Sequence, residues 1–379
     1  NSLATNTTGA NNVAIGDGVL VANTTANDNT GLGHRALLSN TTGAGNVAVG
    51  SLALDANTTA SNNTAVGYVA MTANTTGYSN TAVGKSALST LTTGNQNVAL
   101  GHNALVLATT SSDNTAVGYS ALFDCTTGHS GVAVGSEALT SNTTGHSNTA
   151  VGWKALYTNA TTSWNTAVGT QAAEVYVGNE IDAFGFEALK SCTTGIRNAA
   201  FGAYSLDACT TGVYNNAFGY SALSAVTTGR DNCAFGSSAL VVNTADSNCA
   251  YGYYSGVANT TGTSNSFFGY ASGAACTTGS RNTALGASAN AGSTGNDSTT
   301  VGYQAGAAIT TGSANVAVGS QALLTDASGV HNVAIGHGSL YTSNGSNYNT
   351  AVGGQAMFYT TTGSYNVAVG YDTLQDNTT

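Results

Sequence analysis

The stretch NTAVGYSAL, Asn114–Leu122, decides the fold, because near-copies of it recur along the chain at a fixed spacing. They read NTAVGKSAL at Asn80–Leu88 and NTAVGYVAM at Asn63–Met71. The glycine of this motif recurs in 22 units. The step between units is 17 residues, except for three steps of 16 that end at Gly185, Gly252 and Gly302. A fixed period of this size is typical of solenoid proteins, in which each unit stacks on its neighbours.

The columns of the repeat can be numbered from this corner glycine, taken as position 0. Position −4 is Asn in 19 of the 22 units, and position −2 is Ala in 19. Position −1 is always large and apolar, positions +1 and +2 vary, +3 is small, and +4 is usually Leu or Met. A Thr-Thr-Gly turn follows near positions +8 to +10. No stretch sustains the apolar spacing of a helix, and Thr, Asn and Gly are poor helix formers.

The repeat therefore predicts an all-β fold, a parallel β-solenoid of 22 stacked units of about 17 residues. Each NTAVG strand is expected to pair with the same strand of the next unit, and the Leu at +4 to begin a second strand. We interpret residues 1–379 as a single continuous array and as a segment of a longer fibre. The short unit at 170–185 lacks Thr-Thr-Gly and is expected to be irregular.

Alternation along a strand assigns the faces. The bulky column at −1 is predicted to form the core stripe with the Leu column at +4, and the Ala column to pack against another chain or another part of the coil. The glycine is expected to turn a corner where a side chain would clash or where φ is positive. The predicted core residues are Val66, Val83, Leu100, Val117, Leu88 and Leu122. The Asn column predicts a ladder of stacked amides through Asn63, Asn80, Asn97 and Asn114.

Two kinds of glycosylation are candidates. Asn at +7 precedes Thr-Thr and so forms an N-glycosylation sequon, but the same column holds Leu91, Cys125 and Val226, which indicates an inward side chain. O-glycans on the Thr-Thr-Gly turn fit an outward residue better, with plain turn threonines as the simpler interpretation. The candidate O-glycosylation residues are Thr41, Thr58, Thr75, Thr92, Thr126, Thr143, Thr193, Thr210, Thr227, Thr260, Thr277 and Thr310.

The six cysteines form no CxxC pair, and no histidine lies at zinc-finger spacing. Cys192 and Cys209 share a column in consecutive units, as do Cys233 and Cys249. Stacked strands lie about 4.8 Å apart, which is within the Cα range of a disulfide, but the side chains would run parallel. Small buried thiols are therefore favoured over bridges.

Composition narrows the function classes. Only 6% of the residues are charged, the net charge is −10, and the seven Lys and Arg form no cluster, so no nucleic-acid partner is expected. No apolar run approaches the roughly 20 residues of a membrane span. No phosphate-binding loop, nucleophile elbow or metal-ligand spacing is present, so we expect no enzyme, no cofactor and no metal.

The short motifs NNVAIG (Asn11–Gly16), HNVAIG (His331–Gly336) and YNVAVG (Tyr365–Gly370) resemble the head repeats of trimeric autotransporter adhesins. The stretch NTAVGWKALYTNATTSWNTAVG (Asn148–Gly169) is similar to repeats of bacterial and phage-type tail-fibre-like surface proteins. The resemblance covers essentially the whole chain. It implies a left-handed parallel β-roll, often trimeric, that is displayed outside the cell.

We therefore expect an extracellular structural fibre or fibrous adhesin shaft that self-associates end to end or side by side. The first alternative is a glycan- or receptor-binding module that uses outward aromatic residues. Those residues are Tyr68, Tyr119, Trp153, Tyr220, Tyr253 and Tyr270. The second alternative, ice binding by ranked threonines, ranks lower because the paired threonines precede a glycine in a turn.

Overall fold

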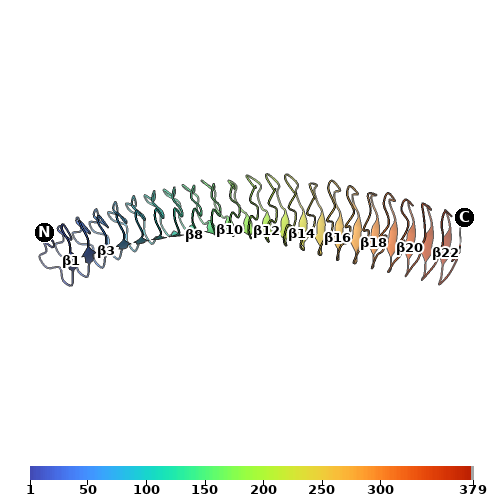
Figure 1. The fold of residues 1–379 in the computed structure, drawn as a ribbon, viewed down its shortest axis with the longest axis horizontal. Helices are drawn as coiled ribbons and strands as arrows, with labels where there is room; N and C mark the ends of the chain where they lie inside the picture. The colour runs from blue at the N-terminus through green and yellow to red at the C-terminus, as the bar shows by residue number, and fades with distance from the viewer. Residues whose placement is uncertain (377–379) are drawn as a thin grey trace. The chain divides into compact units, whose positions relative to one another are not determined.

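The computed structural model describes residues 1–376. Its contacts divide the chain into two compact units, residues 1–194 and residues 195–379. Each unit is a stack of coils of 17 or, in three cases, 16 residues, and each coil contributes one strand of three residues (Figure 1). The described residues contain no helix, and hence none long and apolar enough to cross a membrane.

The strands of the first unit are β1 (Val13–Ile15), β2 (Thr30–Leu32), β3 (Val47–Val49), β4 (Thr64–Val66), β5 (Thr81–Val83), β6 (Val98–Leu100), β7 (Thr115–Val117), β8 (Val132–Val134), β9 (Thr149–Val151), β10 (Thr166–Val168) and β11 (Asp182–Phe184). Those of the second unit are β12 (Ala199–Phe201), β13 (Asn216–Phe218), β14 (Cys233–Phe235), β15 (Cys249–Tyr251), β16 (Ser266–Phe268), β17 (Thr283–Leu285), β18 (Thr299–Val301), β19 (Val316–Val318), β20 (Val333–Ile335), β21 (Thr350–Val352) and β22 (Val367–Val369).

Within each unit, every strand pairs in parallel with the strand of the next coil. The pairing never slips: Thr115 of β7 is opposite Val132 of β8, and Ala116 is opposite Ala133. The same column-to-column register joins β1 through β11 and β12 through β22. The predicted parallel β-solenoid is thus confirmed.

The bulky column at −1 was assigned to the wrong face, whereas the close packing predicted for the Ala column is confirmed and is made within the coil. The Ala column at −2 is fully buried inside the coil, as at Ala116, while the bulky column at −1 lies on the outer face. The predicted core residues Val66, Val83 and Val117 are only half-buried, and Leu100 is 47% exposed. Leu88 and Leu122 at +4 are fully buried, as predicted. The narrow interior has room for a methyl group at −2 because the Leu of +4 already fills it.

The second strand expected at +4 is a turn. Leu122 has φ of 51°, in the left-handed region, and its N–H donates to the Ala138 carbonyl of the next coil at 3.0 Å. A left-handed conformation costs a non-glycine residue about 1–2 kcal/mol. Complete burial of a leucine side chain contributes about 1.5–3 kcal/mol, so the core offsets the backbone strain.

The corner glycine satisfies both conditions expected of it. Gly118 has φ of 136°, and a β-carbon there would lie 2.5 Å from the carbonyl oxygen of Gly135 in the next coil. Real β-carbons do not approach a backbone oxygen so closely. Any other residue at this position would push two coils apart.

The asparagine ladder at −4 is confirmed, with the main chain as a partner. The side-chain Oδ1 of Asn63 accepts from the backbone N–H of Asn80 at 2.9 Å, and Asn80 Oδ1 accepts from Asn97 N–H at 2.9 Å. Asn114 N–H donates to Asn97 Oδ1 at 3.1 Å. The Nδ2 group of Asn63 donates to the Gly77 carbonyl at 2.8 Å. Each amide therefore ties two coils together at a buried site.

A second buried ladder runs through the +7 column, which the sequence indicated as inward. Asn57 Nδ2 donates to Asn40 Oδ1 at 2.8 Å, and Asn74 Nδ2 donates to Asn57 Oδ1 at 3.1 Å. The next residue in the column is Leu91, which has no donor, and Asn74 Oδ1 is left unpaired. Asn259, followed by Cys276, repeats this pattern. Each run of asparagines thus ends on an unpaired oxygen at its C-terminal end.

The short unit at 170–185 keeps its strand in register with the neighbouring coil. β11 pairs with β10 in register, with Asp182 opposite Thr166. Tyr176 occupies the +7 column, where it is fully buried, and its hydroxyl donates to the Asn179 carbonyl at 2.7 Å. One large ring thus fills the interior where a residue is missing from the turn.

One ring also replaces two leucines in the second unit. Phe267 stands at −2 in place of Ala and is fully buried. The +4 residues on either side of it are Gly256 and Gly273, and a β-carbon on either glycine would lie within 2.8 Å of the Phe267 ring. The ring therefore fills the volume that the two missing leucines leave.

The internal asparagine ladder can be tested with Asn57→Leu, since leucine occurs in this column. The change leaves Asn40 Oδ1 without a donor, and a buried unpaired group costs about 1–3 kcal/mol. Asn74→Leu is the matched control, because it orphans Asn57 Oδ1 but removes an oxygen that already lacks a partner. Native-state hydrogen exchange over residues 50–84 should show the larger loss of protection for Asn57→Leu. Equal losses would contradict the ladder as the source of stability.

Phe267→Ala should destabilise the second unit by about 3–5 kcal/mol, because it empties a buried cavity. Adding Gly273→Leu restores the usual Ala and Leu pair and should recover part of that loss in urea denaturation. Phe268→Ala is the control, because Phe268 is 37% exposed and its loss should cost much less. A double variant no more stable than Phe267→Ala would show that ring and glycine are not coupled.

Candidate functional site

The outward columns are where partners or modifications can reach the coils. The first threonine of the Thr-Thr-Gly turn is engaged with the neighbouring coil: Thr41 Oγ1 donates to the Thr58 carbonyl at 3.0 Å. The predicted O-glycosylation residues whose hydroxyls donate in this way are Thr41, Thr58, Thr75, Thr92, Thr126, Thr143, Thr210, Thr260 and Thr310. A sugar on one of these oxygens would remove its hydrogen bond.

The second threonine of the turn is the more accessible one. Thr42, Thr59 and Thr76 are exposed, whereas Thr41, Thr58 and Thr75 are half-buried. The backbone N–H of Thr42 donates to the Thr58 carbonyl at 3.3 Å, so the main chain is fixed while the side chain faces solvent. The sequence could not distinguish the two threonines, because both positions carry the same residue type.

The sequon asparagines are inaccessible. Asn23, Asn40, Asn57, Asn74 and Asn142 are at most 1% exposed. N-glycans throughout the +7 column would require these side chains to leave the interior, and the inward interpretation of the column is confirmed.

The outward aromatic column lies where the sequence placed it. Tyr68, Tyr119, Trp153, Tyr220, Tyr253 and Tyr270 are all exposed. One of these residues, Tyr119, lines a depression on the first unit. Tyr253 and Tyr270 stack with ring centres 5.9 Å apart.

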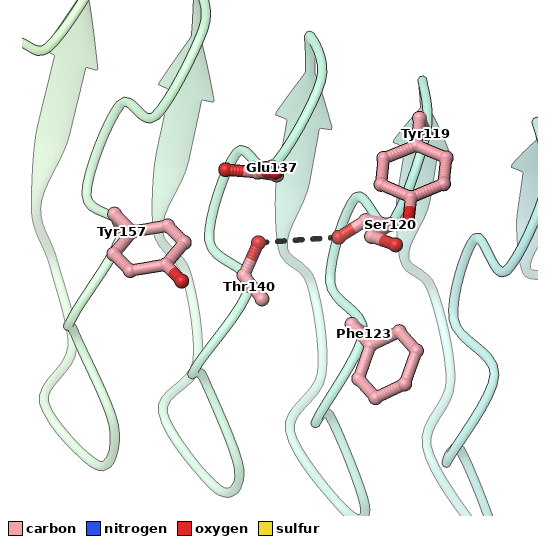
Figure 2. A pocket seen from close by; sticks show the side chains of 6 residues that line it. All are labelled: Tyr119, Ser120, Phe123, Glu137, Thr140 and Tyr157. Carbon is pink, nitrogen blue, oxygen red and sulfur yellow. Dashed lines mark hydrogen bonds between the residues drawn. The ribbon is translucent and has the colours of Figure 1, made fainter.

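A depression of about 260 Å³ lies on the surface of the first unit. Its lining residues follow three consecutive strands, β7, β8 and β9: Tyr119, Ser120, Phe123, Glu137, Thr140 and Tyr157. In Figure 2 the rings of Tyr119 and Tyr157 stand at opposite ends, with Glu137 and Thr140 between them. Thr140 Oγ1 donates to the Ser120 carbonyl at 3.2 Å, and this bond joins two of the turns that line the depression.

A lysine completes the polar side of the depression. Lys154 Nζ lies 3.7 Å from Glu137 Oε2, 4.9 Å from the Trp153 ring centre and 5.1 Å from the Tyr157 ring centre. The carboxylate can accept hydrogen bonds and the ammonium can donate them, side by side, next to apolar ring faces. Phe123 and Tyr157 stand at position +5, which the sequence analysis did not single out. The signal that could have found them is aromatic residues recurring at this position, since Tyr341 and Phe358 also stand there.

The histidines that follow Thr-Thr-Gly stack on one another. His129 and His146 have ring centres 4.9 Å apart and an interplanar angle of 1°, and Trp164 meets His146 edge-on at 5.0 Å. Parallel rings do not converge on one ion. Within residues 1–376 no group of three or more His, Cys, Asp or Glu side chains could hold a metal ion.

Comparison with known proteins leaves the resemblance to adhesin and tail-fibre repeats as a prediction. No protein-family model and no curated protein matches the chain.

Proposed function

We propose that the protein is a structural module of an extracellular fibre or fibrous adhesin shaft, built by stacking near-identical coils. The observation that supports this most is the unslipped register, in which each strand meets the same columns of its neighbour throughout a unit. A coil that contacts only its two neighbours adds length at a constant gain in stability. The buried ladders and corner glycines serve this stacking.

Self-association is the partner interaction that the surface favours. The outer strand face of the first unit exposes apolar side chains of Ile15, Leu32, Val98 and Leu100. Exposed apolar side chains offer surface for association, and 6% charged residues provide little to keep copies apart. We infer that copies associate side by side through this face, in addition to end-to-end stacking. A trimer is the number that the resemblance implies.

A glycan coat is the proposed source of solubility. Uncharged fibres need polar surface, and the exposed second threonines, among them Thr42, Thr59 and Thr76, form a regular outward row. These residues can carry O-glycans without loss of the hydrogen bonds made by Thr41, Thr58 and Thr75.

Analytical ultracentrifugation and negative-stain electron microscopy of the full chain test the structural proposal. We expect concentration-dependent oligomers or filaments for the native protein. Leu32→Asp with Leu100→Asp should abolish side-by-side association, because charge enters the apolar face. Thr42→Asp with Thr110→Asp, which places the same charges on the turn, should not. Monodisperse single chains at every concentration would contradict self-association.

A second candidate function, carbohydrate binding, is favoured by the depression of Figure 2. Two aromatic rings two coils apart, with the Glu137–Lys154 pair beside them, offer stacking faces and both donors and acceptors for neutral sugar hydroxyls. A free cation is a poorer fit, because the Lys154 ammonium already lies over the Tyr157 ring.

A glycan array followed by calorimetry tests this candidate. Tyr119→Ala and Tyr157→Ala should each weaken binding of a hit about three- to tenfold, since an aromatic contact contributes about 0.5–1.5 kcal/mol. Tyr68→Ala is the matched control, because Tyr68 has the same 52% exposure as Tyr119 and lies outside the depression. An array without hits, or equal losses in all three variants, would rule the site out.

A further inference from the structure

Two cysteines of the second unit lie side by side on the outer face. Cys233 begins β14 and Cys249 begins β15, and the two are opposite each other in the parallel register. Their neighbours Ala234 and Ala250 point into the interior, so both sulfur atoms face outward. Cys233 and Cys249 are half-buried free thiols, whereas the other four cysteines of residues 1–376 are buried.

The spacing of the strands disfavours a disulfide between them. In-register residues of neighbouring strands are about 4.8 Å apart, and their side chains leave the sheet in parallel. A disulfide needs β-carbons about 3.8 Å apart and sulfurs about 2.05 Å apart. The two side chains would have to converge, against the stacking of their coils.

The same spacing suits a bridging ion. A zinc–thiolate bond is about 2.3 Å long, and two metal–sulfur bonds of similar length in line span about 4.6 Å, close to the strand spacing. Thiolates select soft ions such as Cu(I). We propose that Cys233 and Cys249 form a two-coordinate site for a soft monovalent metal ion, with Cu(I) as its chemical type. This site is independent of the proposed structural function.

The residues around the pair support this assignment. The Tyr251 hydroxyl lies 3.3 Å from Cys233 Sγ, where it can donate to a thiolate. The rings of Phe218, Phe235, Tyr251 and Phe268 stack at 4.4 to 4.9 Å along one side of the pair and form an apolar wall.

The residues next to the cysteine pair narrow the choice of metal ion. Flanking residues in the same column are Asn216 and Ser266, which are poor ligands for a soft ion. Zinc takes four ligands in structural sites, and the described residues contain no group of three or more ligating side chains. Two thiolates in line are therefore the natural coordination here.

Binding is a proton exchange without electron transfer. Each thiol loses its proton to water, two sulfur–metal bonds form, and the ion keeps its charge of +1, which leaves a complex of charge −1. The Tyr251 hydroxyl stabilises the resulting charge.

Titration of the reduced, oxygen-free full chain with Cu(I) held by bicinchoninate tests the site. We expect one Cu(I) per chain to leave the coloured chelate, and X-ray absorption to show two sulfur ligands. Cys233→Ser and Cys249→Ser should each weaken binding at least tenfold, and Tyr251→Phe about tenfold, as hydrogen-bond partners of ligands do. Serine already occurs in this column at Ser266, so these variants retain the coil fold.

Cys125→Ser is the matched control, because the Cys125 thiol is fully buried inside the coil. Its burial also raises the pKa of that thiol to about 11. It should leave Cu(I) binding unchanged. Equal binding by native protein and the Cys233→Ser/Cys249→Ser double variant would overturn the proposal. So would a signature of three or four ligands, or a disulfide that forms readily between the two residues in air.

Discussion

At the corners of both units, the carbonyl oxygen of one glycine fills the space that a β-carbon on the preceding corner glycine would need. At Gly118 and Gly135 the separation would be 2.5 Å. This approach holds each coil directly over the next, so every column stays in register. Amide ladders and ring stacks then follow, because identical side chains meet at the strand spacing. A substitution at one corner would therefore disturb hydrogen bonds on all sides of the coil.

The repeat predicted the parallel solenoid, the corner and the Asn63 to Asn114 ladder, because these depend on periodicity alone. It misassigned the faces, because a strand of three residues looks the same from either side. Hydrophobicity pointed to Val117 as core, whereas the buried Leu at +4 leaves room at −2 for little more than the methyl group of Ala116. Constancy of size, with Ala in 19 of 22 units, was the better indicator of the interior than apolar character.

The candidate sites were predictable to different degrees. The exposure of Tyr119 and Trp153 could be predicted, because position +1, where both stand, varies from unit to unit. The depression did not, because it combines different columns of three coils and depends on how each turn is folded. The roles of Thr41 and Thr42 were likewise hidden, since only the backbone path decides which hydroxyl meets the carbonyl of the next coil. The pairing of Cys233 with Cys249 followed from the register, but the hydroxyl of Tyr251 beside it did not.

Phe267 couples the packing of two consecutive coils, because its ring lies against a glycine of each. Where neighbouring coils carry the same residues in every column, the loss of one whole coil would leave the remaining coils in register. The ring of Phe267 instead fills the space over Gly256 and Gly273, which belong to consecutive coils. A recombination that separates these three codons leaves either a cavity or a clash. These three residues therefore form one unit of packing that spans two consecutive coils.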